Sequence, residues 1–229
     1  MSDTDDAPDA DRPDARSGDG HGPTVVDGKA RPVSVVVPTA RESTPTLDAV
    51  PDDDGVDLRV RRDEGLNRAR NAGVREAAHD AVLLLDDDLV FSGAWFDGLT
   101  RRVRANPDTV YTAQGAGILP EVDWPDGFTP GMGRVMGFHR ATWRAVDGFP
   151  VPCAHGGDTD FLMSAHESGR DVVGIDHDWE HRDDDVDRYG LTDNLRWLWF
   201  LLWRHPRLVA PRLPALLATK VGVGVGVRR

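Results

Sequence analysis

The chain has 229 residues, carries a net charge of −12 at pH 7, and is 39% hydrophobic, which allows one sizeable domain with tails. The acidic balance argues against a nucleic-acid partner, because no broad basic face is available to neutralise a phosphate backbone. The single cysteine, Cys153, excludes an intramolecular disulfide and a multi-cysteine metal site.

Lysine occurs only at Lys29 and Lys220, so arginine supplies nearly all of the positive charge. This Asp-rich, Arg-for-Lys composition resembles that of proteins from salt-in halophilic archaea, although any acidic protein from a GC-rich genome would look similar. Acidic surfaces of this kind keep proteins soluble by self-repulsion, which salt screens.

Residues 1–31 are acidic and contain almost no large apolar side chains. Such a segment cannot bury enough surface to offset its ordering entropy, so we expect it to be disordered. No apolar stretch resembling a signal peptide occurs near the N-terminus, which favours a cytoplasmic location for the domain that we expect over residues 32–190.

Three strands and a helix are predicted in the first part of this domain. The β-branched run Val33–Pro38 and the segment 56–61 have the composition of strands. Residues 66–78 place apolar side chains at helical spacing, and the apolar run Ala81–Leu85 reads as a buried strand. Strands and helices that alternate in this way indicate βαβ units and a largely parallel sheet, hence an α/β fold.

The run Ala81–Leu85 ends directly at Asp86, Asp87 and Asp88. Ligands of open α/β sheets bind at the carboxyl ends of the strands, where paired carboxylates can hold a divalent cation on a nucleotide diphosphate. Two other Asp triplets, at 52–54 and 183–185, do not follow apolar runs. The first triplet therefore makes the chain a candidate sugar-nucleotide enzyme.

The second half is less regular. Residues 111–133 are rich in Gly and Pro and are expected to be irregular, while 140–146 are predicted to form a short helix before a turn at 147–150. A second helix is predicted over 158–168, ended by a glycine. Asp158 would then lie at or near its N-terminus, where the helix dipole favours a carboxylate.

Residues 191–229 contain the aromatic run Trp197–Trp203, which is too short to span a bilayer. Residues 208–227 are long enough, but Pro and charged residues interrupt them. Tryptophans flanked by arginines favour an amphipathic segment in the membrane interface. Packing on the domain or a contact within a homo-oligomer are the alternatives.

Four segments, taken in order, resemble an inverting family 2 glycosyltransferase of the GT-A fold. Val33–Thr39 is similar to the family's opening strand, and 65–73 (GLNRARNAG) is similar to its G-L-x-x-A-R-N-x-G helix. Leu83–Asp88 supplies a D-x-D, and 156–161 (GGDTDF) is similar to G-E-D-x-D-L. The resemblance implies a Rossmann-like sheet between helices and transfer of a sugar from a nucleotide donor to an acceptor. With residues 191–229 at the inner face of the cell membrane, we expect that acceptor to be a polyprenyl-phosphate or another lipid-linked glycan.

The resemblance also implies roles for individual residues. The positions that match the nucleotide-sugar-binding residues are Pro38, Thr39, Glu42, Arg70, Asp86 and Asp87. The metal ligands implied are Asp88 and His181, with His177 as a rival to the latter, and they suit Mn²⁺ or Mg²⁺. The implied general base is Asp158. The residues implied on the acceptor side are His139, Arg140 and Asp160.

Three features depart from the family pattern. Residues 39–56 are too few for both a long first helix and a second strand. Gly157 replaces the Glu of G-E-D, and Ser164 replaces an Arg that usually follows. These departures leave open a catalytically degenerate sugar-nucleotide-binding or scaffold subunit. A nucleotidyltransferase is a weaker alternative, because 38–41 (PTAR) is not a Gly-rich phosphate loop.

Overall fold

The computed structural model describes residues 32–114, 119, 123–151, 156–176, 178–181 and 190–224. The expected N-terminal tail at 1–31, Cys153 and His177 lie outside these residues. Among the described residues, no helix is long and apolar enough to cross a membrane.

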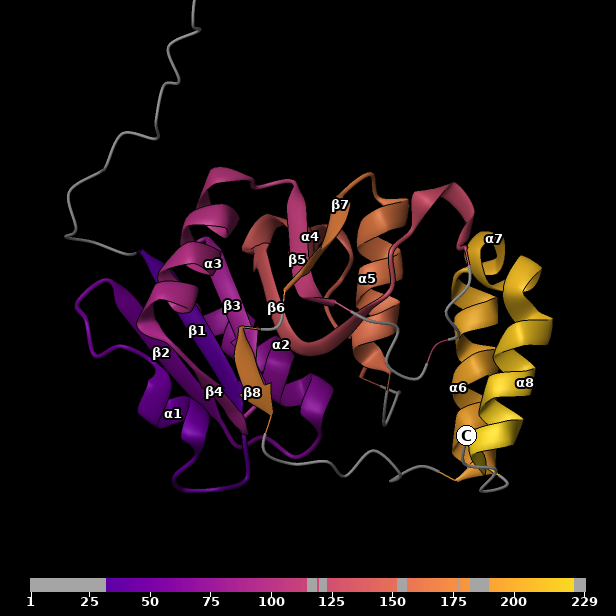
Figure 1. The fold of residues 1–229 in the computed structure, drawn as a ribbon, viewed down its shortest axis with the longest axis horizontal. Helices are drawn as coiled ribbons and strands as arrows, with labels where there is room; N and C mark the ends of the chain where they lie inside the picture. The colour runs from indigo at the N-terminus through magenta and orange to yellow at the C-terminus, as the bar shows by residue number, and fades with distance from the viewer. Residues whose placement is uncertain are drawn as a thin grey trace, which may run out of the picture.

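A six-stranded sheet forms the centre of the molecule (Figure 1). Five strands are parallel and β6 alone runs antiparallel to its neighbours, which confirms the predicted α/β sheet. Its strands, in spatial order, are β2 (Val56–Arg61), β1 (Val33–Pro38), β3 (Ala81–Leu85), β6 (Gly131–His139), β5 (Thr109–Gln114) and β7 (Asp171–Ile175). Strands β4 (Leu89–Phe91) and β8 (Trp179–His181) form a separate antiparallel pair.

Helices cover both faces of the sheet, so the central strands are buried on both sides and read as continuous apolar runs. One face carries α2 (Leu66–Glu76), α4 (Arg140–Ala145) and α5 (Gly157–Glu167). The other carries α1 (Pro45–Ala49) and α3 (Gly93–Ala105). The predicted helices at 66–78, 140–146 and 158–168 are thereby confirmed, within two residues at each end.

Strand β2 is an edge strand, and only α1 and β2 lie between β1 and α2. The short connection predicted from residues 39–56 is therefore present in the fold. Asp57 ties this edge down: its carboxylate accepts hydrogen bonds from Ser34 Oγ (2.8 Å) and Ala78 N (2.8 Å), and it pairs with Arg59 at 2.7 Å. Burial would raise the pKa of Asp57, but these partners hold the pKa below its usual value.

The end of β5 and the start of β6 fall within residues 111–133, which were predicted to be irregular. Glycines make β6 a weak strand by propensity, but neighbours on both sides supply its pairing. The glycines are needed for space, because a Cβ at Gly131 would lie 2.1 Å from Thr112 Cγ2 and one at Gly137 would lie 2.5 Å from Val103 Cγ2. Tertiary pairing thus overrides local propensity here.

The C-terminal residues form α6 (Leu191–Arg204), α7 (Pro206–Val209) and α8 (Leu213–Gly224), with a 3₁₀ turn, η2, at Ala210–Arg212. Another 3₁₀ turn, η1, spans Pro125–Gly127. The three helices gather beside α5 at the right of Figure 1. Trp197, Leu198 and Leu201 of α6 belong to the same core cluster as α2 and α5. One side of this segment therefore packs on the domain.

Candidate active site

Thr46 holds the acidic turn at the end of β3 in place. Its hydroxyl is fully buried, donates to the carbonyl of Asp86 (2.7 Å), and accepts the backbone N–H of Leu89 (2.9 Å). A short helix, α1, positions this threonine, and a side-chain cap from Thr44 starts that helix. Thr46 thus holds both ends of the turn that contains Asp86–Asp88.

Asp87 connects the ends of two neighbouring parallel strands. The hydroxyl of Thr39, directly after β1, donates to Asp87 Oδ2 and accepts the backbone N–H of Arg41 at 2.9 Å. Arg41 Nε lies 4.0 Å from the same carboxylate oxygen. Pro38 and Thr39 are buried, whereas Glu42 is exposed on the bend that follows. These predicted donor-side residues therefore lie together, just beyond the carboxyl ends of β1 and β3.

Arg70 projects from α2 beneath Asp86. Its Nη2 lies 3.3 Å from Asp86 Oδ1 and 3.4 Å from the carbonyl of Gly133, and its guanidinium lies over the Phe149 ring. Only 3% of Arg70 is exposed. In this position it orients Asp86, and the approach to a donor diphosphate implied by the family resemblance stays a prediction.

The carboxylates of Asp88 and Asp158 are close enough to that of Asp86 to act on its charge. Burial raises the pKa of Asp86, the charge of Arg70 opposes this rise, and the nearby carboxylates of Asp88 and Asp158 raise the pKa further. The Asp86 carboxylate therefore lies in an environment of unfavourable like charge, which a bound cation would relieve.

Asp158 lies in the first turn of α5, as predicted, and Gly133 of β6 fixes its side chain. Its Oδ2 accepts the backbone N–H of Gly133 and its Oδ1 accepts the N–H of Thr159, both at 2.9 Å. The Gly133 N–H is available because the pairing of β6 with β5 jumps from Met136 to Met132. This bulge turns a backbone donor toward the carboxylate.

A family model described as "Glycosyl transferase family 2" matches residues 34–150, which is slightly more than half of the chain. The chain belongs to glycosyltransferase family 2. This confirms the family and the kind of enzyme expected from the sequence motifs. No curated protein matches this glycosyltransferase in sequence.

Solved glycosyltransferases share the fold. TarS of S. aureus, in complex with UDP, is 13% identical with a TM-score of 0.51, over 83% of this chain and 70% of that one. The mannosyltransferase PcManGT from Pyrobaculum calidifontis, in complex with GDP-Man and Mn²⁺, is 16% identical with a TM-score of 0.51, over 84% and 73%. At these identities the likeness supports the GT-A-type fold alone.

Two predicted acceptor-side residues of this glycosyltransferase lie elsewhere. His139 pairs with Ala81, at the start of β3, because β6 runs antiparallel. Arg140 bonds the carbonyl of Ala77 and lies 3.3 Å from Asp80. Both therefore lie at the amino end of β3, whereas the carboxylates lie at its carboxyl end. The expectation that they line the acceptor side is corrected, because β6 runs antiparallel to β3.

Asp160, the third predicted acceptor-side residue, also lies apart from the carboxylates of the acidic turn and Asp158. Its carboxylate is fully buried and lies 2.6 Å from Arg204 Nε and 3.0 Å from His205 Nε2. Nδ1 of the same histidine lies 2.7 Å from Glu167. These contacts join α5 to α6 and α7, so Asp160 holds helices together and does not face an acceptor.

His181 can be placed only by its backbone. In the β4–β8 pair it lies opposite Leu89, the residue that follows Asp88. The topology therefore brings the strand position of His181 beside the acidic turn, as its predicted partnership with Asp88 requires.

Two asparagines that hold the backbone at Phe149 and Pro150 near the site were not singled out from the sequence. Asn71 accepts the backbone N–H of Phe149 (2.9 Å) and donates to its carbonyl (2.8 Å), while Asn67 donates to the carbonyl of Pro150 (2.8 Å). Their spacing of four residues in a predicted helix was the signal in the sequence that the two side chains share one face of that helix. A Cβ at Gly157 would lie 2.3 Å from Asn67 Nδ2, which explains why glycine replaces the family's Glu there.

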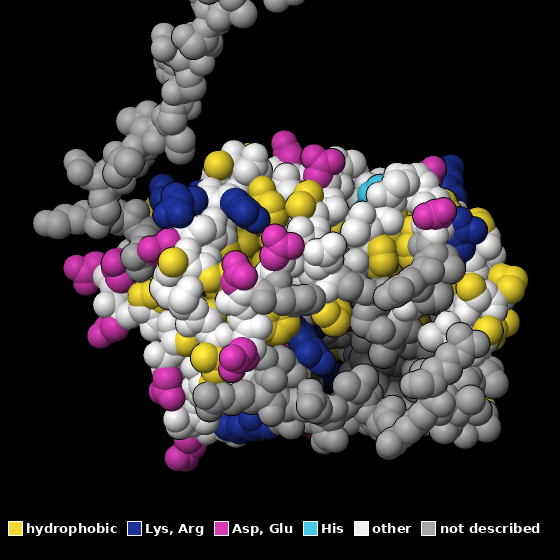
Figure 2. Space-filling model, in the orientation of Figure 1, with side chains coloured by type: hydrophobic (Ala, Val, Ile, Leu, Met, Phe, Trp, Pro, Cys, Tyr) yellow, Lys and Arg dark blue, Asp and Glu magenta, His cyan; other side chains and the backbone are white. Residues whose placement is uncertain are grey.

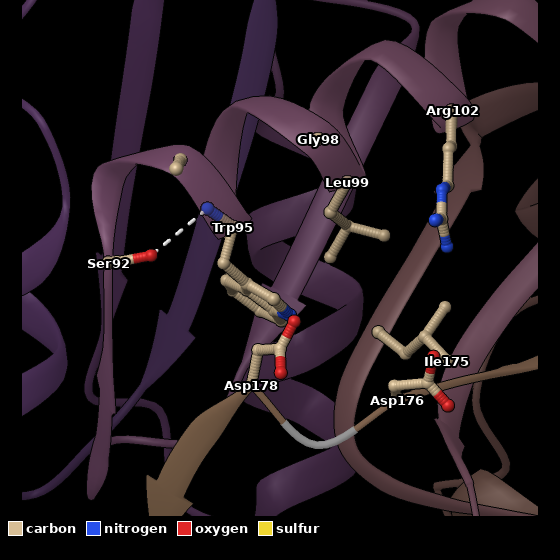
Figure 3. A pocket seen from close by; sticks show the side chains of 9 residues that line it. Ser92, Trp95, Gly98, Leu99, Arg102, Ile175, Asp176 and Asp178 are labelled. Atoms are coloured by element: carbon tan, nitrogen blue, oxygen red, sulfur yellow. Dashed lines mark hydrogen bonds between the residues drawn. The ribbon is translucent and has the colours of Figure 1, made fainter.

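A separate cavity of about 360 Å³ lies between α3 and the end of β7 (Figure 3). Trp95 and Asp178 lie close together in it, and Arg102 points toward Asp176 from across the cavity. None of the acidic turn or of Asp158 lines this cavity, so it is distinct from the carboxylate group.

Proposed function

We propose that this glycosyltransferase transfers a sugar from a nucleotide donor with inversion at C1, at the edge formed by Asp86–Asp88 and Asp158. The observation that carries the proposal is a chain of contacts beside the end of β1. Arg70 joins Asp86 to the carbonyl of Gly133, and the N–H of Gly133 holds Asp158. Ligands of open α/β sheets bind at this edge.

The donor side is formed by Pro38, Thr39, Glu42 and the acidic turn. Thr39 and Asp87 are joined by a hydrogen bond, so the ends of β1 and β3 present one continuous polar surface. TarS has been solved with UDP and PcManGT with GDP-Man and Mn²⁺, which supports a nucleotide-sugar donor by analogy of fold.

The residues at this edge fit a divalent cation. Among the described residues, no three His, Cys, Asp or Glu side chains stand together so as to hold a metal by themselves. Mg²⁺ and similar ions are commonly held by one or two protein ligands together with substrate phosphates. Asp88 and His181 would be those ligands, and the ion would stabilise charge developing on the departing diphosphate.

Asp158 is the proposed general base. Two backbone N–H groups orient its carboxylate, and its side chain is half-buried, so it retains access from the site. It would take the proton of an acceptor hydroxyl as that oxygen attacks C1. The acceptor is a glycan or a polyprenyl-phosphate-linked molecule at the inner face of the membrane, and a phosphate oxygen would need no base.

Calorimetric titration with UDP and GDP, each with and without Mn²⁺, tests the proposal. We expect metal-dependent binding of one nucleotide that Asp88→Ala abolishes. The matched control is Asp108→Ala, which removes a carboxylate that is 74% exposed at the opposite sheet edge.

Release of nucleoside diphosphate from UDP-GlcNAc and GDP-mannose should follow the same pattern. Binding without turnover would instead support the sugar-nucleotide-binding subunit. Absence of binding in folded protein would overturn the proposed donor site.

A further inference from the structure

Helix α6 has two apolar faces. Trp197, Leu198 and Leu201 are buried against the domain. On the opposite side Leu195, Trp199 and Trp203 are 41%, 71% and 75% exposed, at a regular spacing of four residues. At about 100° per residue these three positions and the exposed Arg196 fall within an arc of about 100°. The second apolar face is therefore a continuous surface.

We propose that this exposed face of α6 docks on the surface of an anionic lipid bilayer. Tryptophan suits the bilayer interface, because its ring is apolar and its N–H is polar. The neighbouring α8 packs against α6 and still leaves the stripe exposed, so the fold itself does not cover it.

The charge distribution supports an anionic partner. Residues 191–229 contain seven basic residues and one acid, which gives +6 in a chain whose net charge is −12, so residues 1–190 carry −18. Figure 2 shows most acidic side chains at the left and top of the view, while basic and hydrophobic side chains lie together over α7 and α8. Such a basic, aromatic surface matches phospholipid headgroups above acyl chains.

A second copy of the chain fits less well. Contact between the same α6 face of two copies would bring the exposed Arg196 side chains and two segments of net charge +6 together, and this like charge opposes such a dimer. Self-association is therefore treated as a competing outcome of the test.

The buried face of α6 links such docking to the active site. Gly156 caps the N-terminus of α5, and a Cβ there would lie 1.6 Å from Trp197 Nε1, so the indole packs directly on this turn. Arg204, at the other end of α6, bonds Asp160 of α5. The docked helix would thus hold Asp158 at a fixed distance from the bilayer. This link between docking and catalysis rests on the proposed role of Asp158 as the base for a lipid-linked acceptor.

Co-sedimentation of the full chain with vesicles tests the docking. The vesicles are phosphatidylcholine alone or phosphatidylcholine mixed with phosphatidylglycerol. We expect binding to the mixed vesicles, weakened by roughly tenfold or more in Trp199→Ser/Trp203→Ser and in the charge reversal Arg196→Glu. The control, Arg101→Glu, makes the same charge change at an exposed position of α3 and should bind normally.

Salt dependence separates the arginine from the tryptophan contribution to vesicle binding, and calorimetry of nucleotide binding tests the donor site separately. Raising KCl should weaken the arginine contribution and spare that of the tryptophans. Nucleotide binding by calorimetry should be equal in all variants, so failure of the donor-site proposal would be seen independently. Vesicle binding that is absent, or unchanged in both α6 variants, would overturn the docking. If the wild-type chain forms oligomers and does not bind vesicles, and Trp199→Ser/Trp203→Ser loses the oligomers, the docking is overturned in favour of self-association.

Discussion

Replacement of Gly133 by alanine should displace Asp158 together with the first turn of α5. The added Cβ would lie 2.4 Å from both Cβ and Oδ2 of Asp158. The backbone of Gly133 does not have a positive φ, so alanine is compatible with its conformation. Because Asp158 Cβ is attached to the backbone, rotation of the side chain alone cannot relieve the clash, and the first turn of α5 must move away from β6 at the position where the proposed base must stand.

The expected effect follows from this distance. Ordinary van der Waals contact begins near 3.4 Å, so the carboxylate must retreat by about 1 Å. A displacement of about 1 Å in a reacting group costs on the order of 100-fold in rate, or about 2.7 kcal/mol of transition-state stabilisation. Donor affinity should change little, because the acidic turn and Thr39 are untouched.

Initial rates of nucleoside diphosphate release, with KM for the donor, measure the effect. Gly98→Ala is the control, because no heavy atom lies within 4 Å of its added Cβ and alanine favours the surrounding helix α3. It should keep full activity. A Gly133→Ala enzyme with wild-type kcat would refute the argument that the placement of Asp158 governs the reaction.

Three further substitutions test the packing and charge arguments by urea unfolding. Because the pKa of Asp57 is lowered, its carboxylate stabilises the fold above the unfolded-state pKa of about 4 and loses this contribution at lower pH. Asp57→Asn should thus cost about 1 kcal/mol at about pH 7 and progressively less as the pH falls through the lowered pKa of the folded state, whereas a loss that does not change with pH would contradict the charge argument. Asp160→Ala should cost roughly 3 kcal/mol, because it leaves Arg204 and the buried His205 without their carboxylate. Gly73→Ala should cost about 1–3 kcal/mol, since its Cβ would lie 2.3 Å from a β1 valine side chain; wild-type stability in either variant would show that the site relaxes freely.

The acidic edge of the sheet could be predicted because its signals are local. An apolar run that stops at Asp86 identifies a buried strand and its end without reference to the rest of the chain. The position of Asp158 in the first turn of α5 follows in the same way from a helical pattern ended by glycine. Residues whose roles depend on their own element were therefore placed correctly.

Residues whose roles depend on pairing between distant strands could not be placed in this way. The direction of β6 decides that His139 lies away from the acidic turn, and no local pattern records that direction. The same strand brings Gly133 to Asp158 through a bulge in its pairing with β5. Burial of Asp160 likewise arises from α6 and α7, which follow more than thirty residues later in the chain.

The bulge in β6 also provides a reporter of the site. The Gly133 amide is bonded to a side-chain carboxylate in the middle of a strand, so its hydrogen-exchange rate depends on where that carboxylate points. A ligand that draws Asp158 away would expose this single amide, while the amides that bond β6 to β3 stay protected. Exchange at one backbone position can therefore follow engagement of the proposed base without any assay of turnover.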